Sequence, residues 1–311
     1  LSVNSPTPFF CSHAGPQESV PADGDFTAGV LETMRAQGGI IPLLPGHMAR
    51  LTRSAHLAKS TLERIEATAS AIAKRTEAWP NGARVRLRYG VLGGARVWDF
   101  SVVPLEARSL WDSGVALALC ETRVTAEAGL SPFSADIEEG AVKTRQELAH
   151  ASPLGCKLLQ RETYSLAERE LSDYSSRLLP ELFHEGLLLD PCGRAIEGLR
   201  SNLLVWRDGH WSTPSLRQCG VRGVMLNWLA ARIEISEDAL QVSDIEQAEE
   251  VAVCNAVRGA VPVLQLALGL PVKRRPENTP EAAKLHGSAV RTLASGPATR
   301  ALRAMITDNL W

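Results

Sequence analysis

Residues 186–206 read GLLLDPCGRAIEGLRSNLLVW, and this stretch predicts short β-strands joined by tight turns. The apolar run GLLL ends at DPCG, whose proline and glycine are typical of a turn. A second short strand, AI, precedes Glu197, and a third, NLLVW, closes the stretch. The pair Asp208-Gly209 then predicts a further hairpin turn. We therefore expect antiparallel strands in this region.

The rest of the chain predicts both strands and helices, which differ in the spacing of their apolar residues. Gly38-Gly39 and Gly93-Gly94 indicate hairpin turns. Residues 1–25 are rich in Pro, Ser and Gly, and we expect them to be irregular. Strands are expected at 26–35, 83–91, 95–103, 115–120, 251–253 and 261–268, and helices at 47–73, 158–182 and 221–233.

Composition limits the class of protein. The 311 residues suffice for one large domain or two of ordinary size, and 45% hydrophobic with 22% charged residues is typical of a globular chain. The formal net charge of −2 gives no field that would attract nucleic acid or a membrane surface. We expect a small N-terminal α/β domain at 1–125, a connection at 126–152 and a large C-terminal domain at 153–311.

The chain has neither an apolar window long enough for a bilayer nor the basic start and apolar core of a secretion signal. Its six cysteines are scattered, without a C-x-x-C pair, which favours reduced thiols. We therefore expect a cytoplasmic protein. The motifs G-x-x-x-x-G-K-[ST], G-x-G-x-x-G, H-E-x-x-H and G-x-S-x-G are absent, and the histidines lack metal-ligand spacing, so no metal is expected.

Lys157 lies in the otherwise apolar segment LGCKLL. An apolar environment disfavours the charged ammonium and lowers its pKa, which creates a nucleophilic amine able to form an imine. The alternative is a lysine at a helix start with its ammonium in water.

Other polar residues have two interpretations each. Glu197 beside its hairpin could pair with a protonated ring nitrogen or be a solvated strand end. Asn202 could cap a turn or orient a neighbour, and Asn255 could form only a turn. Arg50 would ordinarily be a surface residue. The glycine-rich stretch 220–225 leads into a helix, whose first backbone N–H groups could bind phosphate.

Taken in order, seven segments between residues 27 and 265 resemble the class IV family of pyridoxal 5′-phosphate (PLP) enzymes. They are GVLETMR (29–35), HMARL with SA (47–55), CKLLQR (156–161), the hairpin from Gly186 to Leu204 with Glu197 and Asn202, Thr213-Pro214, GVRGVM (220–225), and CNA with PV (254–263). The resemblance implies a two-domain fold of type IV, with a smaller N-terminal α/β sandwich, a larger C-terminal α/β domain and PLP in the cleft.

The resemblance also implies residue roles. Lys157 would form the Schiff base with PLP and then move protons as general base and acid. Glu197 would keep the pyridine nitrogen protonated. Arg50, Asn255 and the backbone N–H groups of Val224 and Met225 would hold the phosphate. Asn202 is a further expected cofactor-binding residue.

Within the family, CGVRGVM (219–225), CETR (120–123) and CNA (254–256) resemble the 4-amino-4-deoxychorismate lyase branch. Such an enzyme releases pyruvate and gives 4-aminobenzoate for the folate pathway. The alternatives are an aminotransferase of branched-chain or D-amino acids and a family member without catalysis. The resemblance implies a small amine and carboxylate substrate and a homodimer.

Four features depart from the family pattern or compete with it. Gln160 replaces the usual asparagine, Glu162 stands where an apolar or aromatic residue is usual, and Leu226 replaces an arginine. Lys143, in VKTR, is a rival for the imine lysine. Because these residues flank the expected site, they bear on substrate choice.

Overall fold

The computed structural model describes residues 6–125, 155–174, 176–269 and 290–311. Contacts divide the chain into two compact units. Of the described residues, unit 1 contains 6–107, 155–161 and 308–311, and unit 2 contains 108–125 and 162–307. The chain passes from one contact-based unit to the other after residues 107 and 161. The expected connection at 126–152 lies outside the described residues, so the expected domain limits of 125 and 152 stay a prediction.

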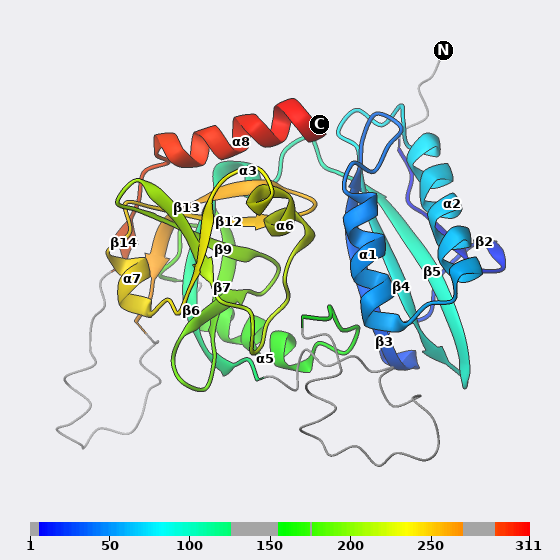
Figure 1. Cartoon of the computed structure of the whole chain (residues 1–311), viewed down its shortest axis with the longest axis horizontal. Coiled ribbons are helices and arrows are strands. Elements are labelled where there is room, and N and C mark those ends of the chain that lie inside the picture. The colour runs from blue at the N-terminus through cyan, green and yellow to red at the C-terminus, as the bar shows by residue number, and fades with distance from the viewer. Residues whose placement is uncertain (1–5, 126–154, 175, 270–289) are drawn as a thin grey trace. The chain divides into compact units, whose positions relative to one another are not determined.

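Unit 1 is built on an antiparallel sheet with the strand order β2-β1-β5-β4-β3 (Figure 1). The long strands confirm the expected ones. The expectation that residues before 26 are irregular is wrong, because they form two strands and a turn of 3-10 helix. The elements are β1 (Phe9–Ser12), β2 (Gly15–Gln17), η1 (Asp23–Asp25), β3 (Phe26–Ala36), β4 (Ala83–Leu92) and β5 (Ala95–Pro104).

Two helices cover one face of this sheet, α1 (Leu44–Ala55) and α2 (Lys59–Arg75) (Figure 1). Val30 and Met34 of β3 pack in the same core as Leu51 and Ile65 of these helices. A single helix over 47–73 was expected, but His56 adopts a left-handed φ of 49° and ends α1. The alternate residues of β3 point to the opposite face of the sheet.

Unit 2 contains a nine-stranded mixed sheet, ordered β11-β10-β9-β12-β13-β6-β7-β8, with β14 beside β13. Strand β6 pairs in parallel with both β13 and β7, whereas β9, β12 and β13 pair antiparallel. Its strands are β6 (Val115–Arg123), β7 (Phe183–Leu189), β8 (Ala195–Gly198), β9 (Asn202–Arg207), β10 (His210–Pro214), β11 (Ile235–Asp238), β12 (Glu250–Asn255), β13 (Gly259–Ala267) and β14 (Arg291–Thr292). The strands expected from the opening stretch are thus confirmed.

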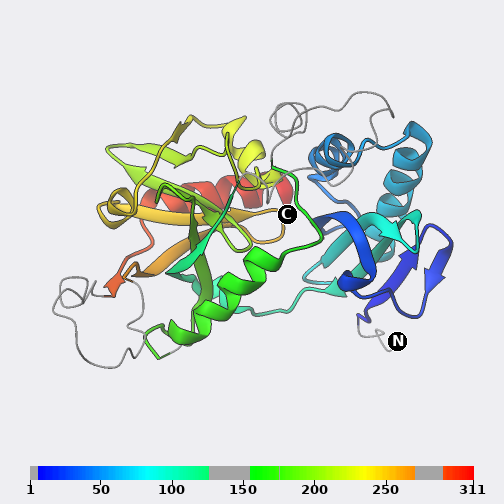
Figure 2. The same cartoon turned by 90° about the horizontal axis from the view of Figure 1, so that it is seen from below.

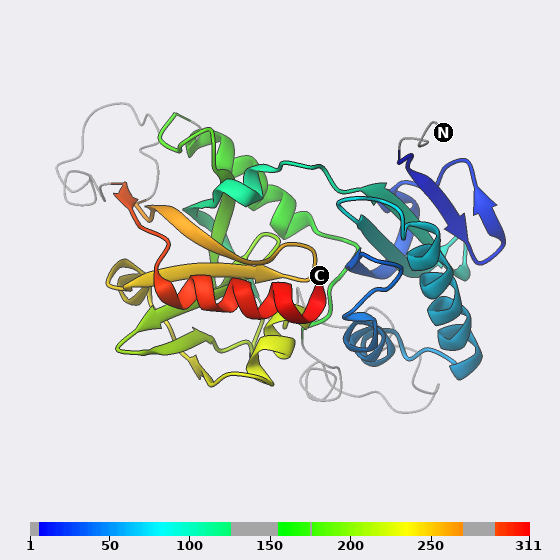
Figure 3. The ribbon, with the colours of Figure 1, turned by 90° about the horizontal axis from the view of Figure 1, so that it is seen from above.

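Among the described residues, the helices that lie wholly or mostly in unit 2 are α3 (Leu110–Ser113), α5 (Glu162–Glu170), η4 (Leu171–Tyr174), α6 (Val224–Ala230), α7 (Val242–Glu246) and α8 (Pro297–Leu310). Helix α5 packs against β6, where Cys120 Sγ donates to the carbonyl of Ala167 at 3.7 Å (Figure 2). Helix α8 runs along β12 and β13 (Figure 3). The buried carboxylate of Glu250 accepts hydrogen bonds from its first-turn amides.

The helices of unit 2 are shorter than the apolar spacing predicts. In the region expected to be helical at 158–182, Leu158 forms a β-bridge and helix begins at Glu162. The helix expected at 221–233 covers only Val224–Ala230. None of the helices in the described residues is long and apolar enough to cross a membrane.

Candidate active site

Lys157 belongs to a short segment that pairs with β3. The Leu31 amide donates to the carbonyl of Lys157 at 2.8 Å, and the Leu159 amide donates to the carbonyl of Gly29 at 2.9 Å. A Cβ at position 29 would lie only 2.9 Å from Leu159 Cδ2, so glycine allows this close approach. The backbone on both sides of Lys157 is therefore held by the sheet.

The amine of Lys157 is removed from bulk water. Its Nζ donates to Thr33 Oγ1 at 3.3 Å. Desolvation, followed by the charges of Arg161 and Arg50, lowers the pKa of Lys157 to about 7. The side chain is half-buried, whereas Lys59 and Lys74 are exposed. Since α5 begins only at Glu162, Lys157 is not a solvated lysine at a helix start.

A buried ionic cluster lies on the helix-covered face of the same sheet. Glu32 of β3 is 2% exposed and accepts from Arg50 Nε at 2.7 Å and from Arg50 Nη2. His47 Nδ1 lies 2.6 Å from Glu32 Oε2, the oxygen that also accepts from Arg50 Nη2. Arg50 is thus a buried residue with a fixed guanidinium, not a surface arginine.

Electrostatics define the protonation states of this cluster. Although desolvation raises the pKa of Glu32, the charge of Arg50 and hydrogen bonds from His47 and Arg50 lower it to about 2. Desolvation lowers the pKa of His47, which favours a neutral ring that donates through Nδ1. Within the described residues, His47 Nε2 has no hydrogen-bond partner. Sequence reasoning missed Glu32 and His47; the available signal was a glutamate at the alternate position between two apolar residues of a strand.

In unit 2, Glu197 of β8 is buried at 4% exposure. Its Oε1 accepts from the hydroxyl of Tyr164 at 2.5 Å, and its Oε2 accepts from the Val221 amide at 3.1 Å. Glu197 is therefore not a solvated strand end. Tyr164 was not recognised from the sequence, because nothing near it along the chain indicates its partner.

Asn202 organises the loop that leads into α6. Its Nδ2 donates to the carbonyl of Val221 at 2.8 Å, and its Oδ1 accepts from the Gly223 amide at 2.9 Å. A Cβ on residue 223 would lie 2.1 Å from Asn202 Oδ1, so any larger residue there would displace the Asn202 side chain. Val224 and Met225 follow as the first two residues of α6, as expected.

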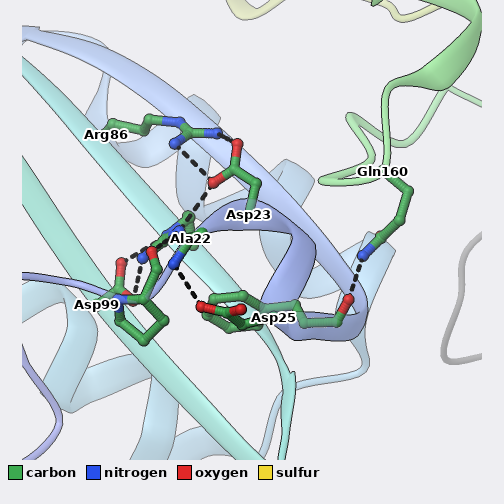
Figure 4. Close-up of polar contacts among 9 residues, drawn as sticks. Ala22, Asp23, Asp25, Arg86, Asp99 and Gln160 are labelled. Carbon is green, nitrogen blue, oxygen red and sulfur yellow. Dashed lines mark hydrogen bonds and ion pairs between the residues drawn. The ribbon is translucent and has the colours of Figure 1, made fainter.

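The remaining expected residues have mixed outcomes. Asn255 Oδ1 accepts from the main-chain amides of Val257 and Arg258 at 3.0 and 2.8 Å, so the side-chain oxygen of Asn255 caps the turn between β12 and β13. Leu226 is fully buried in α6. Gln160 Nε2 donates to the carbonyl of Phe26 at 2.9 Å, which ties the Lys157 segment to β3 (Figure 4). Lys143 lies outside the described residues.

The expected site residues therefore fall into two groups. Unit 1 brings together Lys157 and Arg50, whose charge lowers the pKa of Lys157. Unit 2 brings together Glu197, Asn202 and the start of α6 through the loop that ends at Gly223. Both groups contain buried or half-buried polar side chains, and the lowered pKa of Lys157 is the kind of perturbation that clusters at functional sites.

Comparisons with known proteins identify the family to which this chain belongs. The sequence profile of the family described as Amino-transferase class IV matches residues 29–266, and the chain belongs to this family. Its members are PLP-dependent enzymes, and the mixed α/β architecture is that of fold type IV. A search of curated protein sequences finds no match.

Several solved structures share the fold. A 4-amino-4-deoxychorismate lyase from Pseudomonas aeruginosa is similar with a TM-score of 0.66 and 22% identity, over 97% of this chain and 99% of the other. A hypothetical aminotransferase from Mycobacterium tuberculosis in a PLP-bound form gives 0.70 and 18%, over 98% and 99%. A PLP-bound aminotransferase from Brucella abortus gives 0.68 and 15%, over 97% and 99%.

Proposed function

We propose that this PLP-dependent enzyme resembles aminodeoxychorismate lyase in activity and eliminates pyruvate from 4-amino-4-deoxychorismate to give 4-aminobenzoate. The observation that carries the proposal is Lys157, a half-buried lysine whose pKa is about 7 and whose backbone is bonded to β3. Such an amine is about half neutral at pH 7, so it can both accept and return a proton. The lyase branch is supported by the strings at 120–123, 219–225 and 254–256 and by the similarity to the Pseudomonas aeruginosa lyase.

The polar side chains of the two groups suit the functional groups of PLP one by one. Lys157 supplies the amine for its aldehyde, Glu197 the carboxylate for its ring nitrogen, and Arg50 a cation for its phosphate. The amides of Val224 and Met225 would add donors to the phosphate. When bound, PLP supplies a carbonyl that condenses with amines and a protonated ring that withdraws electrons from the reacting bonds.

The residues of this chain would divide the remaining work. The neutral amine of Lys157 accepts a proton from the ring of the substrate and returns it to the leaving three-carbon unit. That unit departs as pyruvate while the ring becomes aromatic. Thr33 Oγ1, which accepts from Nζ, would aim the amine. Glu197 keeps its carboxylate oriented through Tyr164 and Val221. The loop fixed by Asn202 would position the amides at the start of α6.

Covalent attachment of the cofactor tests the assignment of Lys157. Borohydride reduction of the loaded enzyme, followed by peptide mass spectrometry, is expected to place the phosphopyridoxyl group on Lys157. The visible absorption band of bound PLP is expected to be lost in Lys157→Ala and retained in Lys143→Ala, the variant of the rival lysine. The modification on Lys143 instead would overturn the assignment.

Product analysis tests the reaction. We expect release of pyruvate and 4-aminobenzoate from aminodeoxychorismate, with no requirement for a keto acid. An aminotransferase is the second candidate, since other similar structures are of aminotransferases. Keto-acid-dependent turnover of branched-chain or D-amino acids, without turnover of aminodeoxychorismate, would replace the lyase by this alternative. Turnover of neither would point to a family member without catalysis. We also propose a homodimer, which sedimentation of the loaded enzyme tests.

A further inference from the structure

The face of the unit 1 sheet opposite α1 and α2 is rich in arginine. In the register of β3 and β4, Thr33 lies beside Arg86 and Arg35 lies beside Arg84. Arg88 is two residues further along β4, so strand alternation puts all three β4 arginines on this face. The face is thus strongly cationic, and its acids, Asp99 and Asp23, determine which of these charges are compensated.

One arginine forms a buried ion pair. Arg88 Nε and Nη2 donate to the two oxygens of Asp99 at 2.9 and 2.8 Å, and both side chains are buried, at 3% and 5% exposure. Arg88 Nη1 also donates to the carbonyl of Pro21 at 2.8 Å. A buried, bidentate pair of this kind is costly to separate, because either partner alone would leave a desolvated charge.

A second arginine is paired differently. Arg86 presents Nη1 and Nη2 to the two oxygens of Asp23 at 3.0 and 2.6 Å, in the fork geometry with which arginine binds carboxylates (Figure 4). Here the arginine side chain is 29% and the aspartate side chain 44% exposed. Asp23 Oδ1 also accepts from Nη1 of the buried Arg88 at 2.8 Å, but Arg88 keeps its hydrogen bonds to Asp99 and to the Pro21 carbonyl when Asp23 moves away. Since the ion pairs of an exposed carboxylate contribute little net free energy, a competing carboxylate can replace Asp23.

The Arg86 fork is close to the amine of Lys157. Thr33, the hydrogen-bond acceptor of Lys157 Nζ, is the direct cross-strand neighbour of Arg86. Such neighbours have Cβ atoms about 5 Å apart. Arg86 is also among the charges that lower the pKa of Lys157. A carboxylate held by Arg86 would therefore lie beside the reactive amine.

We propose that Asp23 is an internal carboxylate that occupies the binding fork of Arg86, and that a carboxylate of the substrate displaces it. The inference rests on the proposed function, whose substrate carries two carboxylates beside its amine. Asp23 lies in η1, just before β3, and is bound by side chains of the sheet. Asp23 keeps the Arg86 guanidinium oriented in the free enzyme. By competing for the same donors, Asp23 also lowers the affinity of Arg86 for anionic ligands.

A matched pair of substitutions separates competition from a merely structural role. Asp23→Asn removes the competing charge and keeps the shape. Asp25→Asn, in the same short helix, changes a carboxylate that accepts from the Ala22 amide at 2.7 Å (Figure 4). If Asp23 only anchored η1, both substitutions would act alike, through stability. If it competes, only Asp23→Asn changes carboxylate binding.

The test is calorimetric titration of the PLP-loaded enzyme with 4-aminobenzoate, and with aniline as the probe that lacks the carboxylate. We expect Asp23→Asn to bind 4-aminobenzoate about two- to fivefold more tightly than the wild type, as is typical for loss of an exposed ion pair. Asp25→Asn should match the wild type. Arg86→Gln should bind more weakly, and adding Asp23→Asn to it should have no further effect. Aniline binding should not change in any variant.

The inference would be overturned if Asp23→Asn bound 4-aminobenzoate no more tightly than the wild type. It would also be overturned if Asp23→Asn raised the affinity by the same factor in the Arg86→Gln variant, or if none of the proteins bound 4-aminobenzoate. Thermal unfolding checks that each variant is folded, and Asp23→Ala serves as a second variant. The turnover assay separates this inference from the proposed function. If only the proposed function is wrong, aminodeoxychorismate is not turned over but the expected pattern of 4-aminobenzoate binding is still observed. Turnover without an effect of Asp23→Asn would refute the inference alone.

Discussion

The protonation of Lys157 in the cofactor-free chain is expected to change near pH 7. The pH is raised from about 5 to about 11, a range that includes both the lowered pKa of Lys157 and the ordinary pKa of a lysine. Desolvation is the main cause of the lowered pKa, so the amine should lose its proton well before an exposed lysine does. Lys59, whose side chain is 90% exposed, is the internal reference.

The size of the effect follows from the two pKa values. A fall from 10.5 to about 7 leaves Lys157 about half neutral at pH 7, whereas a lysine at the ordinary value is neutral in about one molecule in 3000. The shift corresponds to a preference for the neutral amine on the order of 5 kcal/mol. Between pH 7 and 10.5 the unfolded chain binds the extra proton, so the stability of the cofactor-free chain rises with pH in that window.

Competitive labelling measures the midpoint directly. The cofactor-free chain is treated with a trace of acetic anhydride at each pH, and peptides containing Lys157 and Lys59 are quantified by mass spectrometry. The Lys157 midpoint should lie near 7 and should fall further in Glu32→Gln, because the charge of Glu32 raises the pKa of Lys157. A Lys157 midpoint that coincides with that of Lys59 would refute the reasoning.

Two further predictions concern the supporting residues. Glu32→Gln removes the negative charge that faces buried Arg50 and should cost about 3 kcal/mol of stability. Since the pKa of Glu32 falls from 4.5 to about 2 on folding, the wild-type advantage is present above pH 4.5 and is lost as the pH falls to about 2. Urea unfolding at several pH values checks this, and an equal loss of stability with acid in both proteins would contradict it. Gly223→Ala puts a Cβ 2.1 Å from Asn202 Oδ1 and should weaken PLP binding about tenfold in equilibrium dialysis. Gly24→Ala, whose Cβ would meet nothing within 4 Å, is the control, and equal affinities in the two variants would argue against the role of the loop.

Local patterns in the sequence predicted most strands and their turns. At Gly93-Gly94 the hairpin has φ values of 58° and 81°, which glycine adopts without strain. The helix boundaries were less predictable. Leu158 fits a helical spacing, yet it pairs with β3, because the backbone hydrogen bonds offered by a distant strand outweigh a weak local preference.

The candidate site shows the same division. The apolar surroundings of Lys157 and the order of motifs along the chain were sufficient to select this lysine and the class IV family. The hydrogen-bond partners of the buried glutamates could not be predicted from the sequence. Glu32 is bound by residues 15 and 18 positions away, and Tyr164 donates to Glu197 across 33 positions. Such pairs form only when strands and helices pack, and no spacing rule relates them.

The amino-acid sequence by itself determined the strands, their glycine turns and the family, and it singled out Lys157 as the candidate for the imine lysine, since these depend on neighbouring residues and on short ordered motifs. Only the tertiary structure decided that Arg50 is buried against Glu32, that Asn255 caps a turn and that Asp23 fills the fork of Arg86. The physical reason is that desolvation and ion pairing depend on which distant groups share a dry environment, and packing alone determines that.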